Sequence, residues 1–246
     1  MPRRLYYTCG YWFSLSVFGA VSLGLNAACA FLLLFPGRAR RGPAVREAIR
    51  RLFARWTRWL NSANLVTVTW HGLEAGPLPR SMVYVANHPS LVDATLILDR
   101  LPDAVCIFKP ALSRNPFLAA AAVMAEYGSG SAGIDLIRDL AAKVASGCTA
   151  LIFPEGTRTS EPPRFHPLKP GFAAIAKRAK APVQVLILKV DRELLRSRHR
   201  PWWRAPHLPA HFDIHVDRRI PYDPGTTVEQ LVAEVEGIFA DRLGNP

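Results

Sequence analysis

A long uncharged segment at the N-terminus constrains this chain more than any other feature. No charged residue occurs between Leu5 and Gly37. Within that segment, Leu15–Phe35 supplies about 21 mostly apolar positions, enough for a helix to span a hydrocarbon core of roughly 30 Å. Aromatic residues crowd its N-terminal end, as they do at membrane interfaces. We therefore expect residues 1–37 to be a membrane anchor, as one span or a short helical hairpin; a cleaved signal peptide is the alternative.

Arginine is concentrated directly after this segment. Two arginines precede it, whereas eight lie between Arg38 and Arg58, with Glu47 as the only acid among them. Because segments rich in Lys and Arg stay on the cytoplasmic side, we expect the rest of the chain in the cytoplasm. This predicts a protein of the bacterial inner (cytoplasmic) membrane whose functional domain lies on the cytoplasmic face.

Residues 38–60 combine this charge with the hydrophobic period of a helix. The apolar side chains that share one face are Val45, Ile49, Leu52, Phe53, Trp56, Trp59 and Leu60. A basic amphipathic helix beside a membrane anchor is expected to lie on anionic headgroups. The alternative is a helix that packs on the protein core and keeps its charged face in solvent.

Composition limits the partners and cofactors. The 246 residues carry a net charge of +12 and half of them are apolar, which excludes a disordered chain. The charge lies beside the anchor and the sequence holds no nucleic-acid recognition module, so we expect membrane lipids and no nucleic acid as partners. The four cysteines lie far apart, without a CxxC pattern or a Cys/His cluster, so we expect reduced thiols and no metal site.

Beyond residue 60, strand-like apolar runs alternate with helical patterns. The expected strands are Leu65–Trp70, Met82–Ala86, Ala104–Phe108, Thr149–Phe153, Val183–Val190 and Phe212–Val216. The expected helices are Leu91–Leu98, Pro116–Ala125, Ile134–Ala145, Gly171–Ala179 and Val228–Leu243. This alternation predicts one α/β domain over residues 61–246, with a mostly parallel or mixed sheet flanked by helices. The Gly128–Gly133 stretch is expected to be a flexible loop.

The motif NHPSLVD at residues 87–93 follows one of these strands directly. On a continuous helix, residues five apart point roughly 140° away from each other. His88 and Asp93 can therefore meet only if His88 lies in a turn and Asp93 in the next helix, and Pro89 favours a helix that begins there. An aspartate beside an imidazole fixes its tautomer and stabilises the imidazolium, as a general base requires. The alternative is a histidine that only caps the helix.

The motif FPEGTRT at residues 153–159 ends another apolar strand. Loops after strand ends are where α/β sheets bind ligands. Gly156 lets the backbone approach a ligand, Thr157 adds a hydroxyl, and Arg158 offers a guanidinium fork for phosphate. Glu155 is either a binding residue or a buried acid that caps the turn.

Together the two motifs resemble those of the lysophospholipid (glycerolipid) acyltransferase superfamily, of the 1-acylglycerol-3-phosphate acyltransferase type. Members carry N-H-x-x-x-x-D and, roughly 60–70 residues later, F-P-E-G-T-R-S/T. Here Glu155 follows Asp93 by 62 positions. The resemblance covers about residues 60–220, including Phe108-Lys109-Pro110.

This resemblance implies a membrane-bound enzyme that transfers an acyl group from acyl-CoA or acyl carrier protein to a hydroxyl of a lipid-like acceptor. It implies no cofactor beyond that co-substrate and no metal. His88 would be the general base and Asp93 its partner. The residues implied in substrate binding are Asn87, Lys109, Glu155, Gly156, Thr157 and Arg158.

The sequence departs from the family between the two motifs. Phosphatidic-acid-forming members carry an arginine there, whereas residues 125–131 (AEYGSGS) contain none. This favours an acceptor other than lysophosphatidic acid, unless Arg114 or Arg138 folds back to supply the guanidinium. The stretches WWR (202–204) and PAHF (209–212) resemble acyltransferases of the bacterial aryl-polyene subgroup. Two alternatives stay open: a 1-acyl-sn-glycerol-3-phosphate acyltransferase that makes phosphatidic acid, and a catalytically inactive membrane protein that binds lipid or carrier protein.

Overall fold

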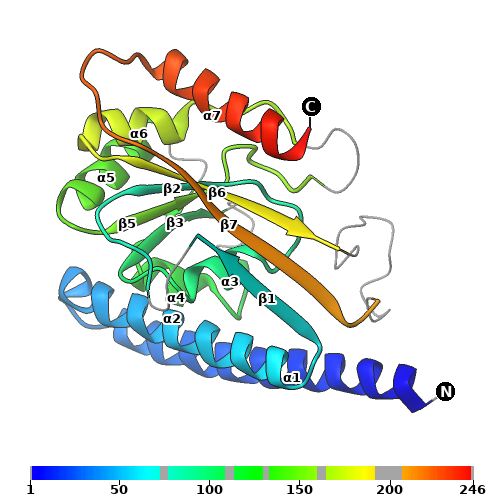
Figure 1. Cartoon of the computed structure of the whole chain (residues 1–246). Helices are drawn as coiled ribbons and strands as arrows, with labels where there is room; N and C mark the ends of the chain where they lie inside the picture. Colours follow the sequence, from blue (N-terminus) through cyan, green and yellow to red (C-terminus); the bar gives the residue numbers. More distant parts are fainter. Residues whose placement is uncertain are drawn as a thin grey trace.

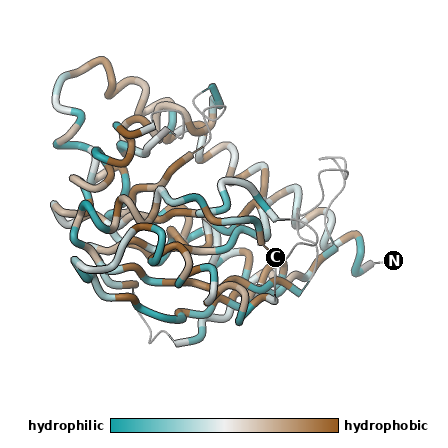
Figure 2. The backbone as a smooth tube through the Cα atoms, turned by 90° about the horizontal axis from the view of Figure 1, so that it is seen from above, coloured by the Kyte–Doolittle hydropathy of each residue, from teal (hydrophilic) through white to brown (hydrophobic). Residues whose placement is uncertain are grey.

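The computed structural model of the chain describes residues 2–72, 77–108, 114–129, 133–159, 165–191 and 207–244. Lys109, a predicted substrate-binding residue, and the WWR stretch lie outside the described residues. A sheet lies between two layers of helices (Figure 1). Hydrophobic and hydrophilic stretches alternate along the tube in Figure 2, because each strand and helix of a layered fold buries one side and exposes another.

The sheet is mixed, with seven strands in the order β1-β7-β6-β2-β5-β3-β4. The strands are β1 (Val66–His71), β2 (Val83–Ala86), β3 (Ala104–Phe108), β4 (Gly128–Ser129), β5 (Thr149–Ile152), β6 (Val183–Val190) and β7 (Ala210–Ile220). Neighbours pair in parallel except β6 and β7, which are antiparallel. The predicted α/β class, with a mostly parallel or mixed sheet flanked by helices, is confirmed.

Three helices cover one face of the sheet. They are α5 (Gly133–Ala145), α6 (Gly171–Ala179) and α7 (Val228–Leu243). Their buried side chains, such as Phe172 and Phe239, pack against Val85 and Val185 of the central strands. Since β2, β5 and most of β6 are buried on both faces, their sequences read as continuous apolar runs.

Four helices lie on the opposite face: α1 (Pro2–Leu32), α2 (Arg38–Ser62), α3 (Asp93–Leu98) and α4 (Ala119–Met124). In Figure 1, α1 and α2 run antiparallel and side by side below the sheet, with α3 and α4 nearer to it. The Phe18 ring of α1 packs on the Trp56 ring of α2, and the Trp56 indole donates to the Ser14 hydroxyl at 2.8 Å. The apolar stripe of α2 therefore packs on protein.

Helix α1 is long and apolar enough, by length and composition alone, to cross a membrane. A signal sequence or the core helix of a soluble protein would pass the same test. Most of this helix is not covered by protein, and its exposed large apolar side chains include Leu5, Phe13, Leu15, Val17, Val21, Leu23 and Phe31. The N-terminal segment therefore forms an apolar helix that could anchor the protein in a membrane.

One arginine of the predicted basic face of α2 is buried. Arg46 is 4% exposed, and its Nε lies 2.6 Å from Asp103 Oδ1. Its Nη1 lies 3.3 Å from Glu126 Oε2, so both partners come from loops of the α/β unit. A buried guanidinium needs such partners because transfer out of water is costly. Arg46 therefore ties α2 to the domain instead of facing solvent or lipid.

Two local predictions are wrong. Gly128 and Ser129 were expected in a flexible loop, but they pair with Ile107 and Phe108 as β4. A Cβ at Gly128 would lie 2.2 Å from Leu136 Cδ1, so only glycine fits beneath α5. Strand β7 is also longer than expected, because its pairing with β6 continues past the charged residues 217–219 to Ile220.

Candidate functional site

The two motifs lie at the same edge of the sheet. Strands β2 and β5 are parallel neighbours, so their carboxyl ends are adjacent. His88 follows β2 and Phe153 follows β5. Residues 65 positions apart in sequence are thereby brought together, at the edge where ligands bind in sheets of this type.

His88 and Asp93 are in contact. His88 Nδ1 lies 2.8 Å from Asp93 Oδ2, with His88 in the turn after β2 and Asp93 as the first residue of α3. The carboxylate is fully buried, whereas the imidazole is 20% exposed. Within the described part of the chain, His88 Nε2 has no hydrogen-bond partner. The imidazole can therefore take up a proton at Nε2 while Asp93 holds Nδ1–H.

Ser90 was not predicted as a site residue, yet it fixes Asp93. Its hydroxyl donates to Asp93 Oδ1 at 2.5 Å and its backbone N–H donates to Oδ2 at 2.6 Å. Helix α3 begins only at Asp93, four residues after Pro89, and the Val92 N–H in the preceding turn donates to the Ser90 hydroxyl at 3.2 Å. The Ser-x-x-Asp spacing before an apolar run was the signal that could have identified Ser90.

Glu155 connects the two motifs. It is 3% exposed, and its Oε1 accepts the backbone N–H of His88 at 3.1 Å. Its Oε2 accepts the His166 N–H at 3.0 Å and the Thr159 hydroxyl. The Thr159 N–H donates in turn to the His88 carbonyl at 3.0 Å. Protein groups thus donate hydrogen bonds to both carboxylate oxygens. This is the arrangement expected if Glu155 is a buried acid that caps the turn.

Asn87 is likewise held by protein. Its amide accepts the Leu188 N–H at 2.7 Å and donates to the Leu188 carbonyl at 2.9 Å. Asn87 is buried, and this pair of hydrogen bonds fixes the end of β2 against β6. In this arrangement Asn87 supports the backbone at the end of β2, and its contact with substrate stays a prediction.

Phe153 is a second residue that the sequence did not identify as part of the site. Its ring stacks on the His88 imidazole, with centroids 4.2 Å apart and an interplanar angle of 21°. Because aromatic pairs in such geometry attract each other, Phe153 restricts the rotation of the imidazole. The first residue of the second motif thus positions the base of the first.

Gly156, Thr157 and Arg158 form the exposed part of the second motif. Gly156 adopts φ +67°, which favours glycine. A Cβ there would lie 2.7 Å from Lys169 Nζ, so the missing side chain leaves room for that ammonium. Thr157 and Arg158 are half-buried. Lys169 is therefore a second cation beside this loop, one that sequence spacing alone did not indicate.

Arg138 is one of the two arginines that could replace the missing arginine between the motifs. Its Nη2 lies 3.0 Å from Asp135 on its own helix, and its Nε lies 3.8 Å from Asp139. These acids hold its charge on the surface of α5. Among the described residues, no cluster of three or more His, Cys, Asp or Glu could hold a metal ion.

The family model described as Acyltransferase matches residues 67–189, half of the chain. The chain belongs to the acyltransferase family. Both motifs of this acyltransferase lie inside the matched range. The resemblance to the glycerolipid acyltransferase superfamily is confirmed, and the aryl-polyene subgroup stays a prediction.

Two individual proteins are similar to this acyltransferase. A 1-acyl-sn-glycerol-3-phosphate acyltransferase from Cocos nucifera is 35% identical over 113 residues, a match that covers 43% of this chain and 36% of that protein. The match thus spans about a third of the relative's length. The crystal structure of the 1-acyl-sn-glycerophosphate (LPA) acyltransferase PlsC from Thermotoga maritima matches with a TM-score of 0.69, over 98% of this chain and 96% of that chain, at 23% identity. At that identity the likeness shows the fold.

Proposed function

We propose that this acyltransferase moves an acyl group from an acyl thioester to a hydroxyl of a lipid-like acceptor, with His88 as the general base. The observation that carries the proposal is the 2.8 Å contact between His88 Nδ1 and the buried carboxylate of Asp93. A membrane protein that only bound lipid or carrier protein would not need a base oriented in this way.

The proposed reaction needs no covalent acyl-enzyme. His88 Nε2 takes the proton of the acceptor hydroxyl while the hydroxyl oxygen attacks the thioester carbonyl carbon. Asp93 stabilises the imidazolium that forms. The C–S bond then breaks, and the leaving thiolate takes the proton from Nε2. The products are an ester and a free thiol, from acyl-CoA or acyl carrier protein as donor.

A membrane anchor is the second part of the proposal. The exposed apolar side chains of α1 support it, and the arginines after residue 37 favour a domain on the cytoplasmic side. After an alkaline carbonate wash, the full chain should stay in the membrane pellet. Release into the supernatant would refute the anchor, and an extracytoplasmic reporter signal after the C-terminus would invert the topology.

Thiol release from an acyl thioester in isolated membranes tests the chemistry. His88→Ala should lower the rate on the order of 10²–10⁴-fold, because it removes the base. Asp93→Asn should lower it less, because the imidazole remains. The matched control is His207→Ala, which removes an exposed histidine outside both motifs. If His88→Ala stays within a few-fold of the His207→Ala rate, the assigned mechanism is wrong.

Lysophosphatidic acid is a second candidate acceptor, which two observations favour. The Cocos nucifera relative is named for this acceptor, and Lys169 stands beside Gly156 as a second cation near Arg158. Complementation of a conditional strain that lacks its lysophosphatidate acyltransferase decides between the two. Rescue that is lost on Lys169→Ala, but not on Lys180→Ala, would support lysophosphatidate. No rescue, with a changed profile of other lipids, would support a different lipid-like acceptor.

A further inference from the structure

The C-terminal helix α7 contacts the segment that follows the second motif. Glu236 Oε1 of α7 accepts the backbone N–H of Leu168 at 2.9 Å. Three residues further along the helix, the buried Phe239 ring packs edge-on against the buried Phe165 ring, with centroids 5.6 Å apart and an interplanar angle of 90°. Residues three apart lie on the same face of a helix, so one face of α7 holds both ends of residues 165–168.

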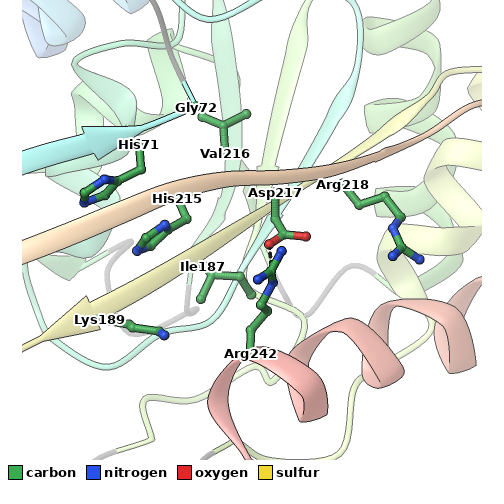
Figure 3. A pocket seen from close by; sticks show the side chains of 9 residues that line it. All are labelled: His71, Gly72, Ile187, Lys189, His215, Val216, Asp217, Arg218 and Arg242. Carbon is green, nitrogen blue, oxygen red and sulfur yellow. Dashed lines mark ion pairs between the residues drawn. The ribbon is translucent and has the colours of Figure 1, made fainter.

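Helix α7 is a firm support for this contact, because both of its ends are fixed. At its start, Thr227 Oγ1 accepts the Gln230 N–H at 3.2 Å, and the Gln230 side chain accepts the Thr227 N–H at 2.8 Å. In its last turn, Arg242 pairs with Asp217 of β7 (Figure 3), and Arg242 Nε lies 2.6 Å from Asp217 Oδ2. Glu236 lies between these two ends and is therefore held in place beside the sheet.

The segment that α7 holds also contacts the second motif. His166 N–H donates to Glu155 Oε2 at 3.0 Å, and Lys169 N–H donates to the Pro154 carbonyl at 2.9 Å. The hydrogen bond from α7 falls between these two, on the buried residue Leu168. The same four residues are thus fixed by the helix on one side and by the motif on the other.

The Lys169 side chain returns to the motif as well. A Cβ added to Gly156 would lie 2.7 Å from Lys169 Nζ, so the ammonium occupies space that only glycine leaves. Lys169 is exposed, and both oxygens of Glu155, the acid of this motif, already accept hydrogen bonds from other residues. The ammonium is therefore available to an anionic group of a substrate.

We propose that Glu236 is a positioning residue for the candidate site, acting through Leu168 on the place of the Lys169 ammonium. This inference rests on the proposed function and deepens it, because it assigns part of the substrate affinity to a helix outside both motifs. A charged side chain binds a ligand more tightly when its backbone is already ordered, since less conformational freedom is lost on binding. Loss of the Glu236 carboxylate should therefore weaken substrate binding and leave the chemical step at His88 in place.

Steady-state thiol release in isolated membranes tests the inference. Palmitoyl-CoA and 1-oleoyl lysophosphatidate, each varied in turn, are the two probes. Glu236→Ala should raise the KM for one of them up to about tenfold, part of the effect of one charged hydrogen bond, and keep kcat within about twofold. Glu236→Gln keeps an acceptor oxygen for Leu168 N–H and should restore the wild-type KM. The matched control is Glu234→Ala, which removes an exposed acid from the same helix.

A double-mutant cycle identifies the path of the effect. In a Lys169→Ala background, Glu236→Ala should change KM by less than about twofold, because the side chain that it positions is gone. An equal rise in KM in both backgrounds would overturn the proposal. So would a rise of the same size in Glu234→Ala, or a loss confined to kcat.

Hydrogen exchange in detergent micelles needs no substrate, so its result does not depend on the proposed function. Residues 166–169 carry three backbone N–H groups, because Pro167 has none. Glu236→Ala should speed the exchange of all three about tenfold or more, including the two that donate to the second motif. Faster exchange of Leu168 alone, or equal exchange in Glu236→Ala and Glu234→Ala, would overturn the proposal whatever the activity.

Discussion

One carboxylate oxygen of Glu155 accepts the backbone N–H of His88 at 3.1 Å, so the second motif holds the backbone of the first. The other oxygen accepts the N–H of His166 and the hydroxyl of Thr159. The buried carboxylate thus accepts hydrogen bonds from three donors. Both carboxylate oxygens are needed to accept all three.

Glu155→Gln is expected to destabilise the fold by about 1–3 kcal/mol, because the new NH₂ group faces at least one of these donors and leaves it unsatisfied. Glu234→Gln, an exposed change on α7, is the control. Thermal unfolding in detergent is the measurement. Equal unfolding temperatures for the two variants would show that Glu155 does not order the site.

Phe153→Leu is expected to lower kcat several-fold, because the imidazole of His88 loses the ring that restricts its rotation. KM should change little, since Phe153 is assigned no contact with substrate. Phe153→Tyr keeps a six-membered ring in place and should retain most of the activity. Steady-state rates that are the same in Phe153→Leu and the wild type would exclude a positioning role.

The sequence predicted those parts of the fold whose signals are local. Helix α6, helix α7 and strand β6 have the expected bounds, because their apolar periods are uninterrupted. The five-residue spacing of His88 and Asp93 required a turn followed by a helix, and this is the observed arrangement.

The remainder depends on contacts between distant segments. Nothing near Phe153 in sequence reveals that its ring meets His88, and nothing near Gly156 reveals Lys169. Arg46 reads as one more exposed cation of a basic helix until Asp103 and Glu126 are seen beside it. Strand β4 has no apolar pattern, because its first residue, Gly128, lies too close to Leu136 of α5 to carry a side chain.

Asn26 of α1 caps a different helix. Its Oδ1 accepts the Ala121 N–H, in the first turn of α4, at 3.0 Å, and its Nδ2 donates to the Pro116 carbonyl at 2.6 Å. The N-cap residue of α4, Leu118, supplies no side-chain hydrogen bond of its own. This polar residue inside the uncharged segment therefore joins the proposed anchor to the domain.

Asn26→Leu should destabilise the full chain by about 1–3 kcal/mol, because it leaves two backbone groups unsatisfied. Ser16→Leu makes a similar polar-to-apolar change at an exposed position of the same helix. It should leave the unfolding temperature in detergent unchanged. A similar temperature for both variants would mean that α1 and α4 are not coupled through Asn26.

Asp99, at the C-terminal end of α3, makes stability depend on pH. Burial raises its pKa to about 7 against the opposing charges of Arg100, Arg50 and Arg58. Within the described residues, its Oδ1 has no hydrogen-bond partner, and Arg100 Nε lies 3.9 Å from it. Between about pH 4 and pH 7 the folded state therefore binds a proton that the unfolded state has lost, and stability falls as the pH rises through this window.

Asp99→Asn removes this dependence, because the amide stays neutral at every pH. Between pH 4 and pH 8, the variant should gain stability relative to the wild type by up to about 4 kcal/mol, the free-energy equivalent of the pKa difference. Unfolding temperatures across this range are the measurement, and the control is Asp241→Asn, an exposed carboxyl on α7. Other titrating groups affect variant and wild type alike, so the difference isolates Asp99. A difference that is constant with pH would show that folding leaves the pKa of Asp99 unchanged. A difference that shifts toward the wild type as the pH rises would show that the neighbouring arginines stabilise the Asp99 carboxylate more than burial opposes it.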